Sequence, residues 1–294
     1  MGVVYEGNFP DPFVLRIEDE RVGEGAHYYA YATNGTLGNV QLLASEDLST
    51  WREVGDAMPA LASWVIPGRT WAPEVLPWPD GRYAMYYTAH CRATDRQAVG
   101  VALADSPEGP FVDDTDGPLL DQDNGGSIDA SPFVDGDGTT YLLWKNDGNA
   151  IGVDTWIYLQ QLAGPRSLVG KVVELIKQDV PWEGNLVEGP FLWPRDGRYY
   201  LFYSANAFDR PEYGEGYAVA DSPLGPFIKA AENPILAGGT EVAGPGHASM
   251  TTLEGRTWLA YHAWQPGKVK EPPGRQFWID EVVWEDGRPT VARE

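Results

Sequence analysis

The sequence has a single cysteine, Cys91, among 294 residues, and it has no long apolar run. One cysteine excludes an intrachain disulfide and a cluster of thiolate metal ligands. A membrane-spanning helix needs roughly 20 apolar residues, so no membrane span is expected. The N-terminal residues show no basic stretch followed by an apolar one, the pattern of a secretion signal. We therefore expect a cytoplasmic protein, unless a leader has been removed.

Basic residues are also scarce, since Lys and Arg number 21 against 43 Asp and Glu, which gives a net charge of −22. Nucleic acids and anionic membranes bind proteins through basic surfaces, so we expect neither as a partner. Helical periodicity is nearly absent as well. Residues 168–176 form the one segment that could be read as a helix, and a strand followed by a turn fits it equally well.

Aromatic residues, glycine and proline are abundant, with 12 Trp, 15 Tyr, 34 Gly and 24 Pro. This composition is typical of an all-β protein with many turns. It also suits the binding of sugars, because aromatic rings stack on the apolar faces of pyranoses and furanoses. Composition alone does not separate the two interpretations.

A proline motif recurs five times at intervals of 55 to 61 residues. Its copies are Asp11-Pro-Phe-Val-Leu15, Ala72-Pro-Glu-Val-Leu76, Ser131-Pro-Phe-Val-Asp135, Gly189-Pro-Phe-Leu-Trp193 and Gly244-Pro-Gly-His-Ala248. A turn and an alternating aromatic segment follow each copy, and Asp-Gly or Glu-Gly dipeptides precede four of these segments. Such dipeptides between strand-like runs predict β-hairpins.

The repeat predicts an all-β fold, a five-bladed β-propeller that occupies residues 1–294 as a single domain. About 55–60 residues per repeat accommodate the four short strands of a propeller blade. The proline motifs then fall on the first strand of each blade, which lines the central channel. Residues beside the five prolines should therefore converge on an axial pocket, where we expect the active site.

Three acidic residues lie beside these prolines on different blades, namely Asp11, Asp129 and Glu188. Apolar residues flank each of them, and burial of a carboxylate costs several kcal/mol or shifts its pKa. Glycoside hydrolysis uses one carboxylic acid to protonate the leaving oxygen and one carboxylate to activate water or attack. A third acid nearby raises the pKa of the general acid by like-charge repulsion. The three carboxylates therefore favour a glycoside hydrolase.

The motifs Asn8-Phe-Pro-Asp-Pro12, Ser127-Ile-Asp-Ala-Ser-Pro132 and Val187-Glu-Gly-Pro190, in this order on a five-blade repeat, resemble glycoside hydrolase family 43. That family comprises α-L-arabinofuranosidases, arabinanases and β-xylosidases. The resemblance covers essentially the whole chain and implies an inverting mechanism. Asp11 would be the general base, Glu188 the general acid, and Asp129 the residue that raises the pKa of the acid and orients it. Inversion predicts a separation of roughly 6.5–9.5 Å between the carboxyl groups of acid and base.

The resemblance also implies roles for three further residues. Gly244-Pro-Gly-His247 places a histidine at the axis, where many family members hold a calcium ion or a water cluster. We expect His247 to contact substrate and to associate with Ca²⁺, whose oxygen ligands would come mostly from water; simple hydrogen bonding is the alternative. Arg275 resembles the arginine of the family's closing segment, which reaches the pocket and grips sugar hydroxyls, whereas a surface salt bridge is the alternative.

Trp71 is predicted to stack on the sugar at the cleavage site, with packing in the core as the alternative. The other histidines lack the spacing of metal ligands and are expected to have structural roles: His27, His90 and His262.

The predicted function is that of an exo-acting α-L-arabinofuranosidase. It would release terminal L-arabinofuranose from arabinan or arabinoxylan oligosaccharides of the plant cell wall. Many β-xylosidases of the family append a β-sandwich after the fifth blade, which this sequence lacks, and Asn8-Phe-Pro-Asp11 suggests an exo-acting member. A β-xylosidase or dual-specificity enzyme is the main alternative. An endo-arabinanase and a non-catalytic sugar-binding propeller are less favoured. A related phosphorylase would need a basic cluster for phosphate, for which only Arg275 is a candidate.

Overall fold

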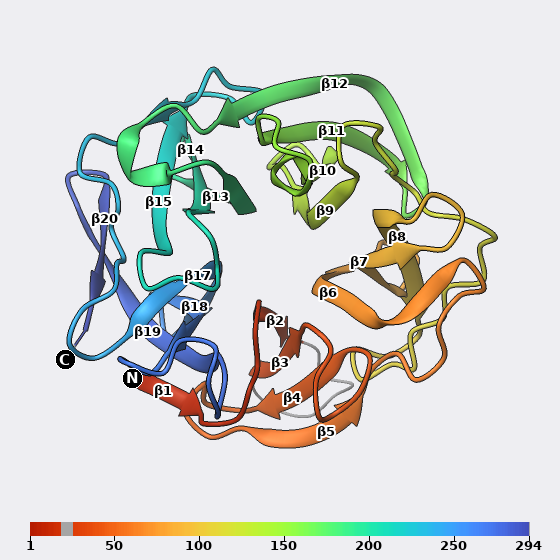
Figure 1. The fold of residues 1–294 in the computed structure, drawn as a ribbon, viewed down its shortest axis with the longest axis horizontal. Helices are drawn as coiled ribbons and strands as arrows, with labels where there is room; N and C mark the ends of the chain where they lie inside the picture. Colours follow the sequence, from red (N-terminus) through yellow and green to blue (C-terminus); the bar gives the residue numbers. More distant parts are fainter. Residues whose placement is uncertain (19–25, 294) are drawn as a thin grey trace.

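The computed structural model describes residues 1–18 and 26–293, and its antiparallel sheets form a ring of five blades (Figure 1). The first three blades contain β2 (Phe13–Glu18), β3 (Ala26–Ala32), β4 (Gln41–Ser45) and β5 (Arg52–Asp56); β6 (Val65–Pro77), β7 (Tyr83–Cys91) and β8 (Arg96–Ala104); and β9 (Ser127–Val134), β10 (Thr140–Asn146), β11 (Trp156–Gly164) and β12 (Ser167–Lys177). The last two contain β13 (Val187–Arg195), β14 (Arg198–Ala205), β15 (Gly214–Ala220) and β16 (Ile228–Lys229); and β17 (Ala243–Leu253), β18 (Arg256–Trp264), β19 (Gln276–Glu285), β1 (Gly2–Tyr5) and β20 (Arg288–Ala292). The predicted five-bladed β-propeller is confirmed.

Helices are limited to short 3₁₀ turns in the described part of the chain, such as η2 (Gly148–Ala150) and η3 (Pro181–Glu183). None of the helices found there is long and apolar enough to cross a membrane. Residues 168–176, which could have been a helix, lie within the strand β12.

The second blade departs from the prediction of four strands per repeat. Its sheet has three strands, and the segment after β8 contributes only isolated bridges, such as Leu103 with Val112. Three prolines, Pro107, Pro110 and Pro118, interrupt this segment, and the matching segment of the fourth blade carries Pro223, Pro226 and Pro234. Proline lacks the N–H that a strand donates to its neighbour, and the outer strand is short in both blades: the two-residue β16 in the fourth, isolated bridges in the second.

The N-terminal strand closes the ring. β1 pairs antiparallel with β19 at Gly2–Ile279, while the far half of β19 pairs with β20 at Glu281–Ala292. Figure 1 accordingly shows both chain ends beside the last blade. Asp280 lies between the two pairings and is 1% exposed. Its Oδ1 accepts the Gly2 N–H at 2.9 Å and its Oδ2 accepts the Tyr261 hydroxyl at 2.7 Å, so this carboxyl joins the first strand, β1, to β18 of the last blade.

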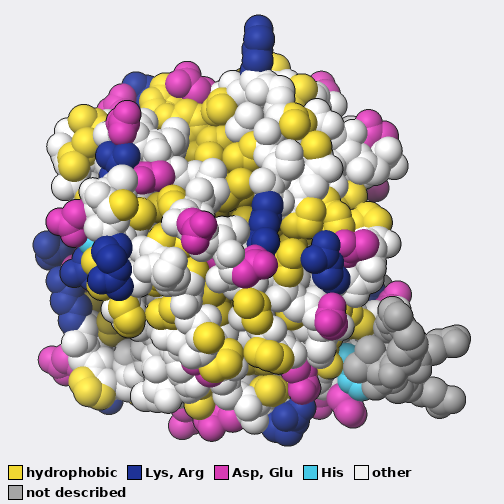
Figure 2. Space-filling model, turned by 90° about the vertical axis from the view of Figure 1, so that its right-hand side faces the viewer, with side chains coloured by type: hydrophobic (Ala, Val, Ile, Leu, Met, Phe, Trp, Pro, Cys, Tyr) yellow, Lys and Arg dark blue, Asp and Glu magenta, His cyan; other side chains and the backbone are white. Residues whose placement is uncertain are grey.

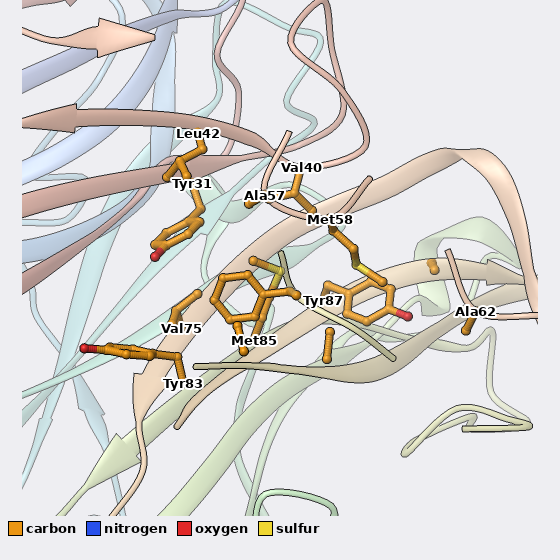
Figure 3. Close-up of a cluster of buried hydrophobic side chains, with 14 of the residues drawn as sticks. Tyr31, Val40, Leu42, Ala57, Met58, Ala62, Val75, Tyr83, Met85 and Tyr87 are labelled. Carbon is orange, nitrogen blue, oxygen red and sulfur yellow. The ribbon is translucent and has the colours of Figure 1, made fainter. Parts of the chain in front are cut away.

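The aromatic strands fill the space between neighbouring blades. In Figure 3, Tyr31 and Leu42 of the first blade lie against a cluster from the second blade that includes Val75, Met85 and Tyr87. The polar end of Tyr31 is satisfied as well, because its hydroxyl donates to the Pro107 carbonyl at 2.5 Å. On the outer surface, acidic and basic side chains are both scattered over the side of the ring seen in Figure 2.

Each blade has at least one residue with a left-handed backbone on or beside its innermost strand, which faces the axis in Figure 1. One of them in each blade is called the bulge residue below: Asp11 (φ 57°), Ala72 (φ 42°), Asp129 (φ 56°), Gly189 (φ 56°) and His247 (φ 53°). The strand register shifts beside the last four, as in a β-bulge. A bulge re-aims the neighbouring side chains, so the bulge residue, rather than the proline, marks the equivalent position in each blade.

In four of the five blades, the N–H of the bulge residue donates to a side chain of the preceding blade that lies on its second strand or directly after it. The bonds run from the amide nitrogens of Ala72 to Thr33 Oγ1 (2.9 Å), Asp129 to Thr88 Oγ1 (3.1 Å), His247 to Ser204 Oγ (2.6 Å) and Asp11 to His262 Nδ1 (3.1 Å). In the fourth blade, the Gly189 N–H instead donates to Asp129 Oδ2 at 3.0 Å.

Replacement of Asp280 tests the closure of the ring. Asp280→Ala leaves the buried Tyr261 hydroxyl and the Gly2 N–H without their acceptor, which we expect to lower the free energy of unfolding by about 2–4 kcal/mol. The measurement is urea denaturation followed by tryptophan fluorescence. Glu281→Ala is the matched control, because the neighbouring Glu281 pairs only with the exposed Arg256. Equal stability of the two variants would contradict a closing role for Asp280.

Candidate active site

A pocket of about 340 Å³ lies where the inner strands converge, and residues from all five blades line it. All the site residues predicted from sequence are among the lining: Asp11, Trp71, Asp129, Glu188, His247 and Arg275. Bulges account for this convergence. Asp11, Asp129 and His247 are bulge residues, while Trp71 and Glu188 directly precede one.

Asp11 is the carboxylate in the pocket that the surrounding side chains hold most firmly in its ionised form. Its Oδ1 accepts from Arg275 Nη1 at 2.8 Å, and its Oδ2 accepts from the Thr33 hydroxyl at 2.5 Å. Burial alone would raise the pKa of Asp11, but the Arg275 guanidinium, with help from His247, holds this pKa well below its usual range. Asp11 is therefore ionised near neutral pH, as a general base requires.

His262 supports Asp11 from behind and is itself neutral. It is fully buried, and burial together with the nearby Arg275 charge lowers the pKa of His262 to about 3. Its Nδ1 accepts the Asp11 N–H, which assigns the ring proton to Nε2. His262 thus has the structural role expected for it, because its ring holds the backbone N–H of Asp11, the predicted base.

Glu188 has a different environment, with a donor on each oxygen. The Tyr213 hydroxyl donates to Oε1 at 2.8 Å, and Lys145 Nζ donates to Oε2 at 3.2 Å. Asp129 reaches the same segment, because its Oδ2 accepts the N–H of Gly189, the residue after Glu188. The predicted acid is therefore held by both neutral and charged partners.

Asp129 is the carboxyl whose ionisation is most strongly opposed in the trio. Burial raises the pKa of Asp129 to about 6; His247 lowers this value and the neighbouring Glu188 raises it. The interaction between Asp129 and Glu188 is the like-charge repulsion that the predicted tuning role requires. The catalytic assignments of the three acids stay predictions, as does the separation of acid and base.

Arg275 and Trp71 reach the pocket as expected, although their predicted sugar contacts stay predictions. The Arg275 guanidinium pairs with Asp11 and lies 4.6 Å over the ring of Phe208. Phe208 is 45% exposed at the pocket, so it offers a second aromatic surface beside the half-buried Trp71.

Sequence reasoning missed several residues of the site, chiefly Thr33, Lys145, Asp147, Asn149, Phe208 and Tyr213. Lys145 carried a usable signal, since it is a charged residue at the end of the apolar strand β10. Tyr213 and Phe208 carried none, because they lie in the connection between β14 and β15.

Few protein side chains near His247 could act as ligands for the predicted calcium ion. Among residues 1–18 and 26–293, no group of three or more His, Cys, Asp or Glu side chains could hold a metal ion. His247 Nδ1 instead lies 3.5 Å from Asp11 Oδ1. Calcium takes six to eight oxygen ligands, which these side chains do not supply. Association through water stays a prediction, and we derive no chemical step through a metal.

Comparisons with known proteins agree on one family. The model of "Glycosyl hydrolases family 43" matches residues 2–289. A crystal structure of a thermostable family-43 glycoside hydrolase superposes with a TM-score of 0.86 and 31% identity, covering 100% of this chain and 96% of the other. An extracellular exo-α-(1→5)-L-arabinofuranosidase from Streptomyces chartreusis is 29% identical over 280 residues, which are 90% of this chain and 82% of that protein. A xylosidase/arabinosidase from Butyrivibrio fibrisolvens is 26% identical over 304 residues, covering 98% and 55% of the two chains.

Removal of the Arg275 charge should shift the pH dependence of activity. Because this guanidinium holds the pKa of Asp11 low, Arg275→Met should move the acidic limb of the pH–rate profile upward by about one unit or more. Initial rates on an aryl glycoside from pH 3 to 8 measure the limb. Arg256→Met, which removes an exposed arginine of the same blade, is the control. An unmoved limb would show that Arg275 does not control Asp11.

Asp129→Asn should lower the activity of the enzyme and raise its free energy of unfolding at alkaline pH. Asp titrates near 3.9 when unfolded, whereas the pKa of Asp129 is raised to about 6 in the folded protein. The native state binds more protons between these values, so stability from this residue falls as pH rises from about 4 to 6. The uncharged amide still accepts the Gly189 N–H. Urea unfolding should show a gain on the order of 2 kcal/mol at pH 8 and little difference at pH 4; a gain independent of pH would contradict the burial of a charge.

Proposed function

Since the chain belongs to glycosyl hydrolase family 43, we propose that it is an exo-acting α-L-arabinofuranosidase. It would release terminal L-arabinofuranose from arabinan or arabinoxylan oligosaccharides. The family consists of inverting glycosidases, and membership places this protein among those that act on plant polysaccharides containing arabinose or xylose. The proposal concerns the finer specificity and the residue roles.

The shape of the site carries the exo-acting proposal. At about 340 Å³ the pocket is near the lower end of the range of ligand sites, roughly 300–1,000 Å³. Side chains from every blade line it, and a small axial pocket accepts the end of a chain more readily than the interior bond of a polymer. Trp71 and Phe208 supply aromatic faces suited to the apolar side of a sugar ring.

The contrast between Asp11 and Glu188 supports an inverting reaction. In the proposed step, the ionised Asp11 takes a proton from a water molecule, whose oxygen attacks the anomeric carbon. Glu188 gives its proton to the glycosidic oxygen as the bond from the anomeric carbon to that oxygen breaks. The charge of Asp129 favours the protonated form of Glu188 before the step. A non-catalytic sugar-binding protein would gain nothing from these opposed environments.

A β-xylosidase or dual-specificity activity is the second candidate. Arabinofuranose and xylopyranose present similarly arranged hydroxyls, so one pocket can accept both. The similarity to the xylosidase/arabinosidase of Butyrivibrio fibrisolvens favours this alternative. Aryl glycosides of the two sugars therefore provide the decisive comparison.

The test measures kcat/KM for a matched aryl α-L-arabinofuranoside and aryl β-D-xyloside, with the first-formed anomer identified by NMR. We expect at least about tenfold preference for the arabinofuranoside, inversion at the anomeric carbon, and arabinose as the only small product from linear arabino-oligosaccharides. Asp11→Asn, which should abolish both activities, controls for a contaminating enzyme. Preference for the xyloside would favour the alternative, longer released products would indicate endo action, and retention of configuration would contradict the mechanism.

A further inference from the structure

In one blade the bulge N–H, beside Glu188, has no acceptor on the second strand of the preceding blade, and it donates instead to Asp129 on the first strand of that blade. The acceptors Thr88, Ser204 and His262 pair across their sheets with the residue directly before a bulge residue. Lys145 of β10 occupies this same position, because it pairs with Ile128 directly before Asp129. An ammonium group has no acceptor atom, so Lys145 cannot hold the next bulge residue, Gly189.

The Lys145 side chain is instead aimed into the active site. It is fully buried, with 0% exposure, and its Nζ donates to Asn149 Oδ1 at 2.7 Å and to Glu188 Oε2 at 3.2 Å. Asp147 Oδ1 lies 4.0 Å away. These three partners all line the pocket. A buried ammonium costs several kcal/mol unless it is paired, whereas the threonine or serine of other blades would complete the fold without that penalty.

We propose that Lys145 is a positioning residue for the general acid. Its ammonium stabilises the carboxylate that Glu188 becomes after it has given its proton to the leaving oxygen. It also fixes Oε2 of Glu188 and, through Asn149, the turn η2 that borders the pocket. The inference rests on the proposed role of Glu188 and adds the group that makes this acid an effective donor.

Several ionisable groups face Glu188 from the surrounding elements. They are Asp129 on β9, Lys145 on β10, Asp147 after β10, Tyr213 before β15 and Glu215 on β15, while His247 on β17 acts on Asp129. Burial raises the pKa of Glu215 well above its usual range, so this group is neutral. Asp129 thus opposes the ionisation of Glu188, and Lys145 favours it.

The two charges act in opposite directions on the same proton of Glu188. Asp129 favours the protonated form, and Lys145 favours the carboxylate that forms as the glycosidic bond breaks. Since a stronger acid protonates a poor leaving group more effectively, removal of Lys145 should matter most for substrates that need protonation.

The experiment compares Lys145→Met, Lys145→Gln and Glu188→Ala on aryl glycosides with good and poor leaving groups, and on a natural arabino-oligosaccharide. We expect Lys145→Met to reduce kcat by about tenfold or more on poor leaving groups and by less than about threefold on good ones. The alkaline limb of its pH–rate profile should move to higher pH, because loss of a nearby cation favours a protonated carboxyl. Lys145→Gln keeps a hydrogen-bond donor without the charge and should show the same shift.

Lys177→Met is the matched control. Lys177 lies on β12 of the same blade and pairs with Asp154 outside the pocket, so its loss should leave both readouts unchanged. Circular dichroism and thermal denaturation establish that each variant is folded, and Lys145→Gln decides the matter if Lys145→Met does not fold.

The outcomes separate this inference from the proposed function. If Glu188→Ala loses activity equally on good and poor leaving groups, the assignment of the acid fails. If Glu188→Ala shows the expected dependence but both Lys145 variants lose activity equally on all substrates with an unmoved alkaline limb, Lys145 is only structural and the inference is overturned.

Discussion

The structure depends on the hydrogen bond that holds the bulge residue of each inner strand. A residue other than glycine in the left-handed region costs roughly 1–2 kcal/mol, so the surroundings must impose that conformation. In every blade, a side chain of the preceding blade accepts the bulge N–H, from or just after its second strand in four cases and from Asp129 on its first strand in the other. The same bond joins neighbouring blades and turns Asp11, Asp129 and His247 toward the axis. Closure of the ring and assembly of the site are therefore a single constraint.

Equivalent backbone positions nevertheless give different chemistry. Asp11 and Asp129 are both bulge residues, yet the pKa of Asp11 lies well below its usual range and that of Asp129 is raised to about 6. Both are buried, so burial does not distinguish them. The difference comes from Arg275, which contacts Asp11 directly, whereas Asp129 has the like-charged Glu188 as a neighbour. Opposed pKa shifts on one repeated scaffold thus distinguish the proposed base from the carboxyl proposed to tune the acid.

Proline spacing predicted the number of blades and found the three acids, because each acid lies within three residues of a repeated proline. It could not predict the equivalent positions. The bulge residue Asp129 lies three residues before Pro132, whereas His247 lies two residues after Pro245, so the prolines do not mark one structural position. Lys145 was missed for a related reason, since its equivalence to Thr88 depends on strand register. The reduction of the fourth strand of the second blade to isolated bridges could not be predicted, because the fourth blade carries prolines in the matching segment and still forms β16.

The position that accepts the bulge N–H can be compared among the blades of this one chain, and it differs from a simple structural residue beside the proposed base and acid. The position that accepts the bulge N–H is Thr33, Thr88 or Ser204 before the second, third and fifth blades, and a small hydroxyl suffices there. It is His262 before the blade of Asp11 and Lys145 before the blade of Glu188. His262 still accepts the N–H and adds a neutral ring beside the base. Lys145 does not accept the N–H of the next bulge residue, and its ammonium contacts the acid instead. The two departures from a hydroxyl thus precede the two blades that carry the proposed base and acid, which a purely structural role for this position would not explain.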